Sequence, residues 1–478
     1  MTGGLELLVV RGDKPLHLQI ADQIQERILS GTLTVGNRLP TVRHLATSAG
    51  VSRVTALQAY EALQVRGLIE SRVGSGTYVA PPQNRESGRG RLKAFKPCSV
   101  TSDFSASARA SGITNFAIGD ADERLFHADE FAAGMLRART VNGEACGPYG
   151  DGALLTSFAS YYRGFGIRAE PESLVVTGGG IATNAALAMT LGAKGAKVVL
   201  QDPAFPHAFD YFQSFNLEVI GVPTVKGDLD IQRFEDELKK GDVSAAFLFL
   251  TVNQCTGESA SLRNKRDVLA LCERFGVNVF EDGSAFWTVG PKGRTPSLWE
   301  LSEGMSTGVV SFDCMTKTLG RSVPISCVFT SKRIKDPMTI RAMGLGSSPP
   351  SMMQHALRAF IESRSMASHI SRSFVRHTTR RQTLLSTLRE HTPHGCSWTE
   401  PSVGHSVWIT LPPHIDESKL YEESLAAGVA VAPGIAASVP RRPVAAVRRS
   451  YGASSVDEIS SGIARFAKVV ERQASLPR

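Results

Sequence analysis

Five short apolar segments in the middle of the chain each run into a polar or glycine-rich loop. They are Leu174–Val176, Val198–Leu200, Ala245–Leu250, Val277–Phe280 and Val309–Asp313. Helix-forming stretches alternate with these strand-like segments. Parallel strands need a crossover connection, usually a helix, so the alternation predicts a mostly parallel sheet flanked by helices. We therefore expect an α/β domain that begins near residue 113.

The 478 residues are too many for one ordinary domain, so further domains are expected on both sides of this sheet. After about Thr392 the pattern changes to that of a small α+β subdomain. Its predicted strands are Ser406–Leu411 and Gly428–Ala432, and its predicted closing helix is Val456–Arg472.

Chemistry-bearing residues gather in the loops after the five central strands. They are Gly178-Gly179-Gly180, Asp202 with Phe205, Asn253-Gln254, Asp282 and Lys317. Ligands of open α/β sheets bind at the carboxyl edge of the strands, where these loops meet. A glycine turn offers N–H groups to a phosphate, a lysine can form a Schiff base with an aldehyde, a carboxylate can hold a pyridinium nitrogen, and an aromatic ring can stack on it. The set describes a pyridoxal phosphate pocket, although each residue alone has a commoner structural explanation.

The first 50 residues predict two helices. Three isoleucines at a spacing of four residues lie on one face of a helix over His17–Leu29: Ile20, Ile24 and Ile28. Pro40 and Thr41 open a second helix, and Gly50 suits the left-handed residue just past its end. A tight turn follows, so this part predicts the first half of a helix-turn-helix.

A third helix and a hairpin complete the motif. Ser52 suits the N-cap of a helix from Arg53 to about Arg66. Its apolar residues recur every three positions and are expected to face the core: Val54, Leu57, Tyr60 and Leu63. Short strands at Leu68–Ser71 and Thr77–Val79 are joined by a glycine-rich turn, in which glycine tolerates positive φ. The whole predicts a winged helix-turn-helix.

Such a module reads DNA with the N-terminal residues of its second helix in the major groove. The expected contacts are Ser52, Arg53 and Thr55 at bases or phosphates, Arg43 at the backbone, and Gly74, Ser75 and Gly76 in the wing. Residues 1–100 hold 13 Lys and Arg against 7 Asp and Glu, a balance of +6 out of a net charge of +8. This excess suits phosphate attraction, but a solvated basic surface explains it equally well.

Residues 81–112 are rich in Pro, Gly, Ser and basic residues and have no sustained apolar period. They predict an interdomain linker. The expected organisation is a DNA-binding domain at 10–80, a linker at 81–112 and a large effector and dimerisation domain at 113–478.

The segments PLHLQIADQIQERILSGTL and RLPTVRHLATSAGVSRVTALQAYEALQVRGLIESRVGSGTYV resemble the GntR family of bacterial regulators over residues 14–80. The resemblance implies transcriptional control. It also implies DNA contact by Arg43, Ser52, Arg53, Thr55 and the wing.

The chain from about Phe116 to Ala467 resembles a fold-type-I aminotransferase domain. The matching motifs are GPYGDGALLTSFASYYR, VVTGGGIATNAALAM, DPAFP, NQCTG, EDGS, TKTLG, GVAVAPG and VRRSYG. A GntR-like reader joined to such a domain is the plan of the MocR subfamily of regulators, which includes GabR-like and PdxR-like proteins. The resemblance implies these roles: Lys317 as the Schiff-base lysine, Asp282 at the pyridine nitrogen, Phe205 stacked on the ring, Gly179, Gly180 and Ile181 at the phosphate, and Arg448, with Arg449 as a rival, at a substrate carboxylate.

Several positions depart from the family pattern. Gln254 and Cys255 replace the usual Asn-Pro before Thr256 and Gly257. The tyrosine expected shortly after Asp282 is absent, and Pro324 stands where an arginine that binds the phosphate is expected. Losing that arginine removes a charge-assisted hydrogen bond of about 1.5–3 kcal/mol. Because transamination needs preorganised donors, the resemblance implies a bound cofactor but weak or absent turnover. Arg321 is a substitute candidate for the phosphate.

Three functions remain open. The first is a regulator whose DNA affinity responds to pyridoxal phosphate or an amino-compound effector through linkage. The second is a working aminotransferase with an incidental DNA module. The third is a regulator whose large domain is a cofactor-free dimerisation scaffold. The aminotransferase resemblance implies a homodimer, which would read paired half-sites on DNA.

The cysteine content and the lengths of the apolar runs bear on the compartment in which the protein works. Seven scattered cysteines form no C-x-x-C pair, which suits a reducing cytoplasm rather than a disulfide framework or a zinc site. The sequence has no run of 18 apolar residues, so no membrane span is expected.

Overall fold

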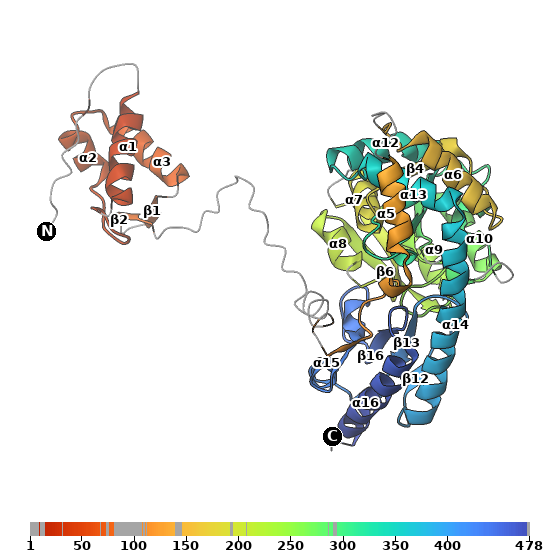
Figure 1. Cartoon of the computed structure of the whole chain (residues 1–478). Coiled ribbons are helices and arrows are strands. Elements are labelled where there is room, and N and C mark those ends of the chain that lie inside the picture. Colours follow the sequence, from red (N-terminus) through yellow and green to blue (C-terminus); the bar gives the residue numbers. More distant parts are fainter. Residues whose placement is uncertain are drawn as a thin grey trace. The chain divides into compact units, whose positions relative to one another are not determined.

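A computed structural model describes residues 9, 15–30, 32–66, 68–72, 76–80, 108, 110, 112–138, 146–191, 195–206, 208–284, 286–289 and 294–475. The chain divides into two compact units, Met1–Phe95 and Lys96–Arg478 (Figure 1). The linker predicted at 81–112 lies mostly outside the described residues.

The described residues of the smaller unit form three helices and a hairpin. They are α1 (Leu16–Leu29), α2 (Val42–Ser48), α3 (Arg53–Val65), β1 (Ile69–Arg72) and β2 (Gly76–Val79). Ile20 and Ile24 are fully buried, as the spacing predicts. Arg66 joins α3 to α1 by hydrogen bonds to Asp22 and Gln25 at 2.6 and 2.8 Å. This packing confirms the predicted winged helix-turn-helix.

One prediction for α3 is wrong. Val54 and Leu57 are 63 and 46 % exposed, while Tyr60 and Leu63 are buried together with Ala56 and Ala59. The physical reason is that 3.6 residues make a turn, so each step of three falls about 60° short of a full circle. Over three such steps Val54 and Leu63 come to lie on opposite sides of the helix.

The larger unit is built on an eight-stranded sheet in the order β4-β11-β10-β9-β8-β5-β6-β7. Its strands are β4 (Leu174–Thr177), β5 (Lys197–Asp202), β6 (Glu218–Val225), β7 (Asp228–Leu229), β8 (Val243–Leu248), β9 (Asn278–Asp282), β10 (Val309–Cys314) and β11 (Ser326–Thr330). The pairs β10–β9, β9–β8, β8–β5 and β5–β6 are parallel, whereas β11 is antiparallel to both its neighbours. All five predicted central strands are present, and the sheet is mostly parallel.

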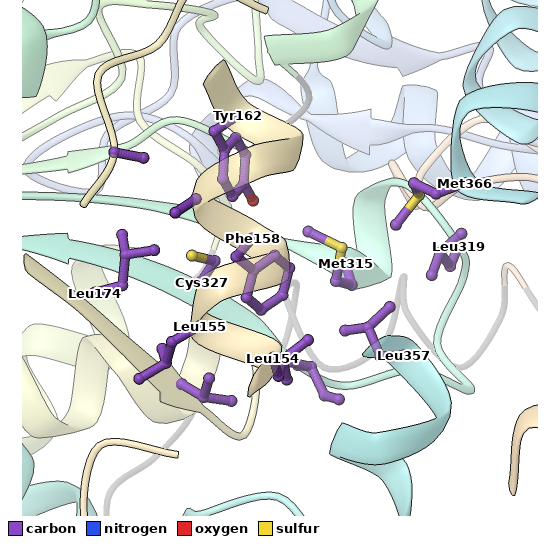
Figure 2. Packing of buried hydrophobic residues seen from close by; sticks show 14 of the residues in the cluster. Leu154, Leu155, Phe158, Tyr162, Leu174, Met315, Leu319, Cys327, Leu357 and Met366 are labelled. Atoms are coloured by element: carbon purple, nitrogen blue, oxygen red, sulfur yellow. The ribbon is translucent and has the colours of Figure 1, made fainter. Parts of the chain in front are cut away.

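Helices cover both faces of this sheet, and alternate strand residues pack on opposite faces. On one face lie α7 (Gly180–Thr190), α8 (Ala208–Ser214) and α12 (Lys332–Gly344), against residues such as Val198 and Phe280. On the other lie α6 (Gly152–Arg163), α9 (Ile231–Lys239), α10 (Leu262–Phe275), α11 (Leu298–Leu301) and α13 (Ser351–Glu362). Figure 2 shows α6 presenting Leu154, Phe158 and Tyr162 to Leu174, Cys327 and Met315. Strands buried on both faces hold the loops at the carboxyl edge firmly in place.

The last part of the chain forms a smaller α+β layer, as predicted. Strands β12 (Ser397–Trp398), β13 (Ser406–Thr410), β16 (Ala446–Ser450) and β15 (Ala432–Pro433) form one sheet, and β14 (Val429–Ala430) pairs with β3 (Thr114–Asn115). The helices here are α14 (Ser365–His391), α15 (Glu417–Ala426) and α16 (Val456–Ala474), and α14 runs beside α16 (Figure 1). Because β3 precedes the large sheet in sequence, residues from both ends of this unit meet in one layer.

The remaining helical pieces are α5 (Ala128–Ala138) and the 3-10 turns η1 (Glu123–Leu125), η2 (Pro171–Ser173), η3 (Phe286–Val289), η4 (Met315–Lys317) and η5 (Gly434–Ala436). Among the described residues, no helix is long and apolar enough to cross a membrane.

Candidate functional site

The turn between α2 and α3 sets up the candidate DNA-reading surface. The hydroxyl of Thr41 caps α2 by accepting the His44 N–H, and that of Ser52 caps α3 by accepting the Thr55 N–H at 3.1 Å. Gly50 takes φ of +62°, which lets the chain turn sharply between the helices. Arg43 and Arg53 are exposed at the starts of α2 and α3. The predicted contact residues therefore stand on one helix-turn-helix.

Four neighbouring side chains form the outward face of α3: Arg53, Val54, Leu57 and Gln58. Two of them are the apolar residues that the sequence pattern wrongly assigned to the core. A recognition helix can place an apolar side chain against the methyl group of thymine. Val54 and Leu57, exposed beside Arg53, are thus candidates for such a contact that period counting missed.

The wing is continued by a segment before α2. Leu39 N–H donates to Thr77 O and Gly36 N–H to Val79 O, so residues 36–39 lie along β2. At Gly76 (φ +121°) a Cβ would stand 2.9 Å from Nε of Arg38. The positive φ favours glycine at position 76, and Arg38 is a wing residue that the sequence did not reveal. Gly74 and Ser75 lie outside the described residues.

In the larger unit, one cavity of about 230 Å³ collects several predicted site residues. Lys317, Phe205, Ile181 and Arg448 line it, with Asp120 among others. The Lys317 ammonium donates to Gly119 O at 2.6 Å and lies 3.4 Å from Asp120 Oδ1. Its nitrogen is 5.6 Å from the centre of the Phe205 ring. The lysine and the aromatic ring thus come together as the motifs predict.

Asp282, buried at the end of β9, pairs with Gln254, a half-buried residue in the loop after β8. Gln254 Nε2 donates to Asp282 Oδ2 at 2.9 Å, and the Ser284 N–H donates to Oδ1 at 2.9 Å. Burial raises the pKa of Asp282, and the hydrogen bonds from Ser284 and the charge of Lys317 oppose that rise. Neither residue is among the described residues that line the cavity. One carboxylate oxygen of Asp282 is thus already engaged by the residue that replaces the family's usual asparagine.

The glycine turn before α7 has the expected shape but also an internal partner. Gly179 takes φ of +93°, and α7 begins at Gly180 without a side-chain cap. The Gly180 N–H donates to Cys314 Sγ at 3.2 Å, and that sulfur lies 3.0 Å from Thr316 Oγ1. A helix N-terminus attracts anions, so Cys314 competes with any phosphate for this amide.

Arg448 and Arg449 are separated by the pleat of β16. Arg448 lines the cavity and donates to the carbonyl of Ala117, and burial lowers its pKa. Arg449 points the other way, with its guanidinium 4.3 and 4.1 Å from the rings of Phe116 and Phe466. Adjacent strand residues face opposite sides, so only Arg448 is placed to meet a ligand in the cavity.

Residues 117–124 pass beside the cavity, and we call this segment the strap. Its carbonyls and carboxylates hold the cavity's cations: Ala117 O meets Arg448, Gly119 O meets Lys317, and Asp120 meets both Lys317 and Arg321, the latter at 3.3 Å. Arg321, the candidate substitute for the phosphate arginine, is thus paired with the strap. Main-chain contacts of this kind leave no pattern in a sequence, which is why the strap was missed.

The cavity residues fit pyridoxal phosphate. Two atoms from its lining, Arg448 Nε and Asn184 Oδ1, are buried without a hydrogen-bond partner among the described residues. A buried polar atom without a partner costs about 1–3 kcal/mol, so this wall suits a polar ligand. Lys317 and Phe205 supply the amine and the aromatic face. Asn184, on α7, is a further candidate contact that the sequence did not single out.

Comparison with known proteins supports the two kinds of domain described above. Residues 16–79 match the bacterial regulatory proteins of the gntR family, and residues 113–461 match the aminotransferase class I and II family. An uncharacterized HTH-type transcriptional regulator of Escherichia coli, YdcR, is 26 % identical over 87 % of this chain and 91 % of its own length. A probable rhizopine catabolism regulatory protein of Rhizobium meliloti, MocR, is 26 % identical over 88 % of this chain and 87 % of its own.

Among solved structures, the α-aminoadipate aminotransferase LysN of Thermus thermophilus, complexed with N-(5'-phosphopyridoxyl)-L-leucine, shares the fold of the larger unit. It has a TM-score of 0.71 and 20 % identity, and the match covers 78 % of this chain and 98 % of LysN. The two family matches, in this order, are those of a transcription regulator with a DNA-reading domain ahead of an aminotransferase-like domain. The chain belongs to the aminotransferase class I and II family and, with its gntR-type domain, is a DNA-binding regulator of the MocR type.

Proposed function

We propose that the larger unit binds pyridoxal phosphate, alone or with an amino-compound effector, and thereby sets the affinity of the gntR-type domain for its operator. One observation carries the proposal: Lys317, Phe205 and Arg448 line a single cavity at the carboxyl edge of the sheet. The aminotransferase class I and II family depends on this cofactor. When bound, the cofactor supplies a reactive aldehyde for amines.

Each cavity residue would have a separate task. Lys317 offers the amine that holds the cofactor, Phe205 offers an aromatic face, and Arg448 offers a guanidinium to an effector carboxylate. Asp282 would hold the ring nitrogen through the carboxylate that Gln254 and Ser284 keep hydrogen-bonded. Gly179, Gly180 and Ile181 would face the phosphate. With Pro324 in place of an arginine, turnover as an aminotransferase would be weak or absent.

The strap offers a route from the cavity to the DNA-reading domain. A ligand that engages Lys317 and Arg448 competes with the strap for both side chains. Residues 81–112, which precede the strap, join it to the gntR-type domain along the chain. A ligand-dependent change in the strap would be the step that couples ligand binding to operator affinity, as linkage requires.

We also propose that the protein acts as a cytoplasmic homodimer. Two copies would present two α3 helices to paired half-sites, spaced by a helical turn or a multiple of it, with about 34 Å per turn.

A second candidate is a regulator whose large domain is a cofactor-free scaffold. The observation that favours it is that the chain already occupies several groups of the pocket: Gly119 and Asp120 hold Lys317, and Cys314 holds the Gly180 amide. Under this proposal the strap contacts are permanent, and they only stabilise the dimerising fold.

The visible absorbance of the purified full-length protein separates the two. With added pyridoxal phosphate, we expect a bound-cofactor band that is retained after desalting and absent in Lys317→Ala. Arg449→Lys serves as a matched control, because it changes a neighbouring buried cation that faces away from the cavity. A wild-type protein that shows no band at saturating pyridoxal phosphate would reject cofactor binding and favour the scaffold.

A further inference from the structure

Three side chains of metal-ligating type meet outside the cavity around Lys317, and one of them, Asp151, belongs to the GPYGDGALLTSFASYYR motif. Cys146 lies just before the turn Gly147–Gly150, Asp151 caps α6, and His355 lies on α13. One donor atom from each, a sulfur, an oxygen and a nitrogen, lies within 4.8 Å of the other two. Cys146 and Asp151 are half-buried, and His355 is buried. The three residues come from two helices and a turn, so tertiary packing brings them together.

The surrounding structure fixes the position of Asp151. Its Oδ1 accepts the Leu154 N–H at 2.6 Å as the N-cap of α6, and its own N–H donates to Gln354 Oε1 at 2.8 Å. Gln354 immediately precedes His355, so this hydrogen bond also fixes α13 relative to the turn. At Gly150 (φ +112°) a Cβ would lie 2.7 Å from Val176. The turn is therefore held against β4 with Oδ2 of Asp151 left facing His355.

The spacing of the donor atoms suits a shared ion better than a direct hydrogen bond. His355 Nε2 is 3.4 Å from Asp151 Oδ2, longer than the ~2.7–2.9 Å of a charge-assisted hydrogen bond. Two ligands at ~2.1 Å from a tetrahedral zinc ion stand ~3.4 Å apart. A thiolate, a carboxylate and a neutral imidazole also balance the charge of a dication.

From this geometry we propose that Cys146, Asp151 and His355 bind a divalent transition-metal ion of the zinc class. The mixed sulfur, nitrogen and oxygen set is one that zinc accepts, whereas magnesium and calcium prefer oxygen alone. Three protein ligands leave a fourth position for water or another ligand. The ion ties the start of α6 to α13, which stabilises the larger unit.

A nucleophilic Cys-His-Asp arrangement is the main alternative for these residue types. In such a triad the histidine stands between its partners and uses a different ring nitrogen for each. Here one donor atom of each residue converges on the other two, and His355 presents Nε2 to the carboxylate. Convergence on one point favours coordination over a proton relay.

One cation already lies close to the cluster, and its effect on affinity can be predicted. Arg358 Nη1 is 3.8 Å from Asp151 Oδ1, and its Nε is 3.8 Å from Glu362 Oε1. Arg358 competes with the ion for the Asp151 carboxylate. Arg358 also pairs with Glu362, which offsets part of its charge. Removing Arg358 should therefore tighten metal binding, an effect opposite to that of removing a ligand.

The test is titration of reduced, metal-free full-length protein with Zn²⁺ and, separately, with Co²⁺ as a spectroscopic probe. We expect one high-affinity ion per chain, a thiolate-to-cobalt charge-transfer band, and an unfolding temperature that rises with free Zn²⁺. Cys146→Ser, His355→Gln and Asp151→Asn should each weaken binding by more than the ~10–100-fold that losing an outer partner costs. Asn keeps the α6 cap, so Asp151→Asn tests coordination without losing the helix start.

Cys396→Ser is the matched control, since Cys396 is the other half-buried free cysteine among the described residues. It should bind as the wild type does, and Arg358→Met should bind more tightly. Absence of the high-affinity ion in wild type, or a cobalt band that survives in Cys146→Ser, would overturn the proposal. These readouts do not depend on whether Lys317 binds pyridoxal phosphate.

Discussion

The outward face of α3 and the cavity around Lys317 are both candidate binding surfaces, but they are prepared in different ways. Arg53, Val54 and Leu57 project from α3 into solvent, and the helix is held from its opposite side by buried Ala56 and Leu63. In the cavity, Lys317 and Arg448 are already held by the strap. The DNA-reading face is exposed, whereas a ligand of the cavity would have to replace the contacts that Lys317 and Arg448 make with the strap. Under the proposed function, a ligand of the cavity would therefore change the contacts of the strap, which is what a sensor requires.

The largest expected effect lies at the anchor of the strap. Asp122 is buried and hydrogen-bonds to Arg124 and to buried Arg380. Asp122→Ala leaves Arg380 without its carboxylate in the interior, which should lower the free energy of unfolding by about 3–5 kcal/mol. Chemical denaturation followed by far-UV circular dichroism measures this loss. An unchanged stability would mean that the strap is held by other contacts.

Acid should reproduce part of that effect. Burial would raise the pKa of Asp122, but the hydrogen bonds and charges of Arg124 and Arg380 outweigh it and lower the pKa below its usual range. A carboxyl with a lowered folded pKa stabilises the fold above its unfolded pKa, and the contribution is lost as the pH falls towards the folded value. Wild type should therefore lose stability below about pH 4. In Asp122→Asn this part of the pH dependence should disappear, as unfolding measured across pH 2–6 would show.

On the other surface, Arg53→Ala should cost about 1–3 kcal/mol of specific operator binding, or roughly 5- to 150-fold, and leave the fold intact. Arg43→Ala should instead weaken binding to all sequences alike and reduce the salt slope by about one. Fluorescence anisotropy with operator and scrambled duplexes at several salt concentrations distinguishes these outcomes. If Arg53→Ala retains full specificity, α3 reads DNA through other residues.

Val54→Ser and Leu57→Ser test whether these two side chains of α3 face solvent rather than the core. Both side chains are exposed, so each change should alter the stability of the smaller unit by less than about 0.5 kcal/mol. Leu63→Ser, in the buried stripe of the same helix, should destabilise it by several-fold more. If the exposed pair contacts thymine methyl groups, the two variants should lose operator affinity while folding normally. A large loss of stability in Val54→Ser would instead support the original expectation that Val54 faces the core.

The comparison also shows what a sequence can reveal. Several caps, turns and strands follow from local signals: Ser52 caps α3, Gly50 turns the chain, and the five apolar segments become β4, β5, β8, β9 and β10. Lys317 and Phe205 meet because parallel strands deliver their loops to one edge. By contrast, the strap acts through the carbonyls of Ala117 and Gly119, which every residue possesses. No residue type marks such a contact, so only the folded chain reveals it.

Val54 and Leu57 illustrate a different limit. A spacing of three is compatible with a helical stripe over two positions, but over four positions it winds around the helix. The sequence also left open whether Arg448 or Arg449 faces the cavity. The pleat puts the two side chains on opposite faces of β16, and a one-residue shift in register would exchange them. Sequence patterns thus predict elements well and the facing of single residues less well.

The smallest effect should come from Asp120, which is only partly buried and shares its charge between Lys317 and Arg321. Asp120→Asn removes a partner that competes with a ligand for both cations, so pyridoxal phosphate should bind more tightly. An ion pair at such a site is worth about 0–1 kcal/mol, which limits the gain to roughly fivefold. Titration monitored by visible absorbance measures it, and Glu123→Gln, in the same strap, serves as a control. A weaker affinity in Asp120→Asn would instead make Asp120 a ligand contact, and the strap would then complete the cavity rather than compete for it.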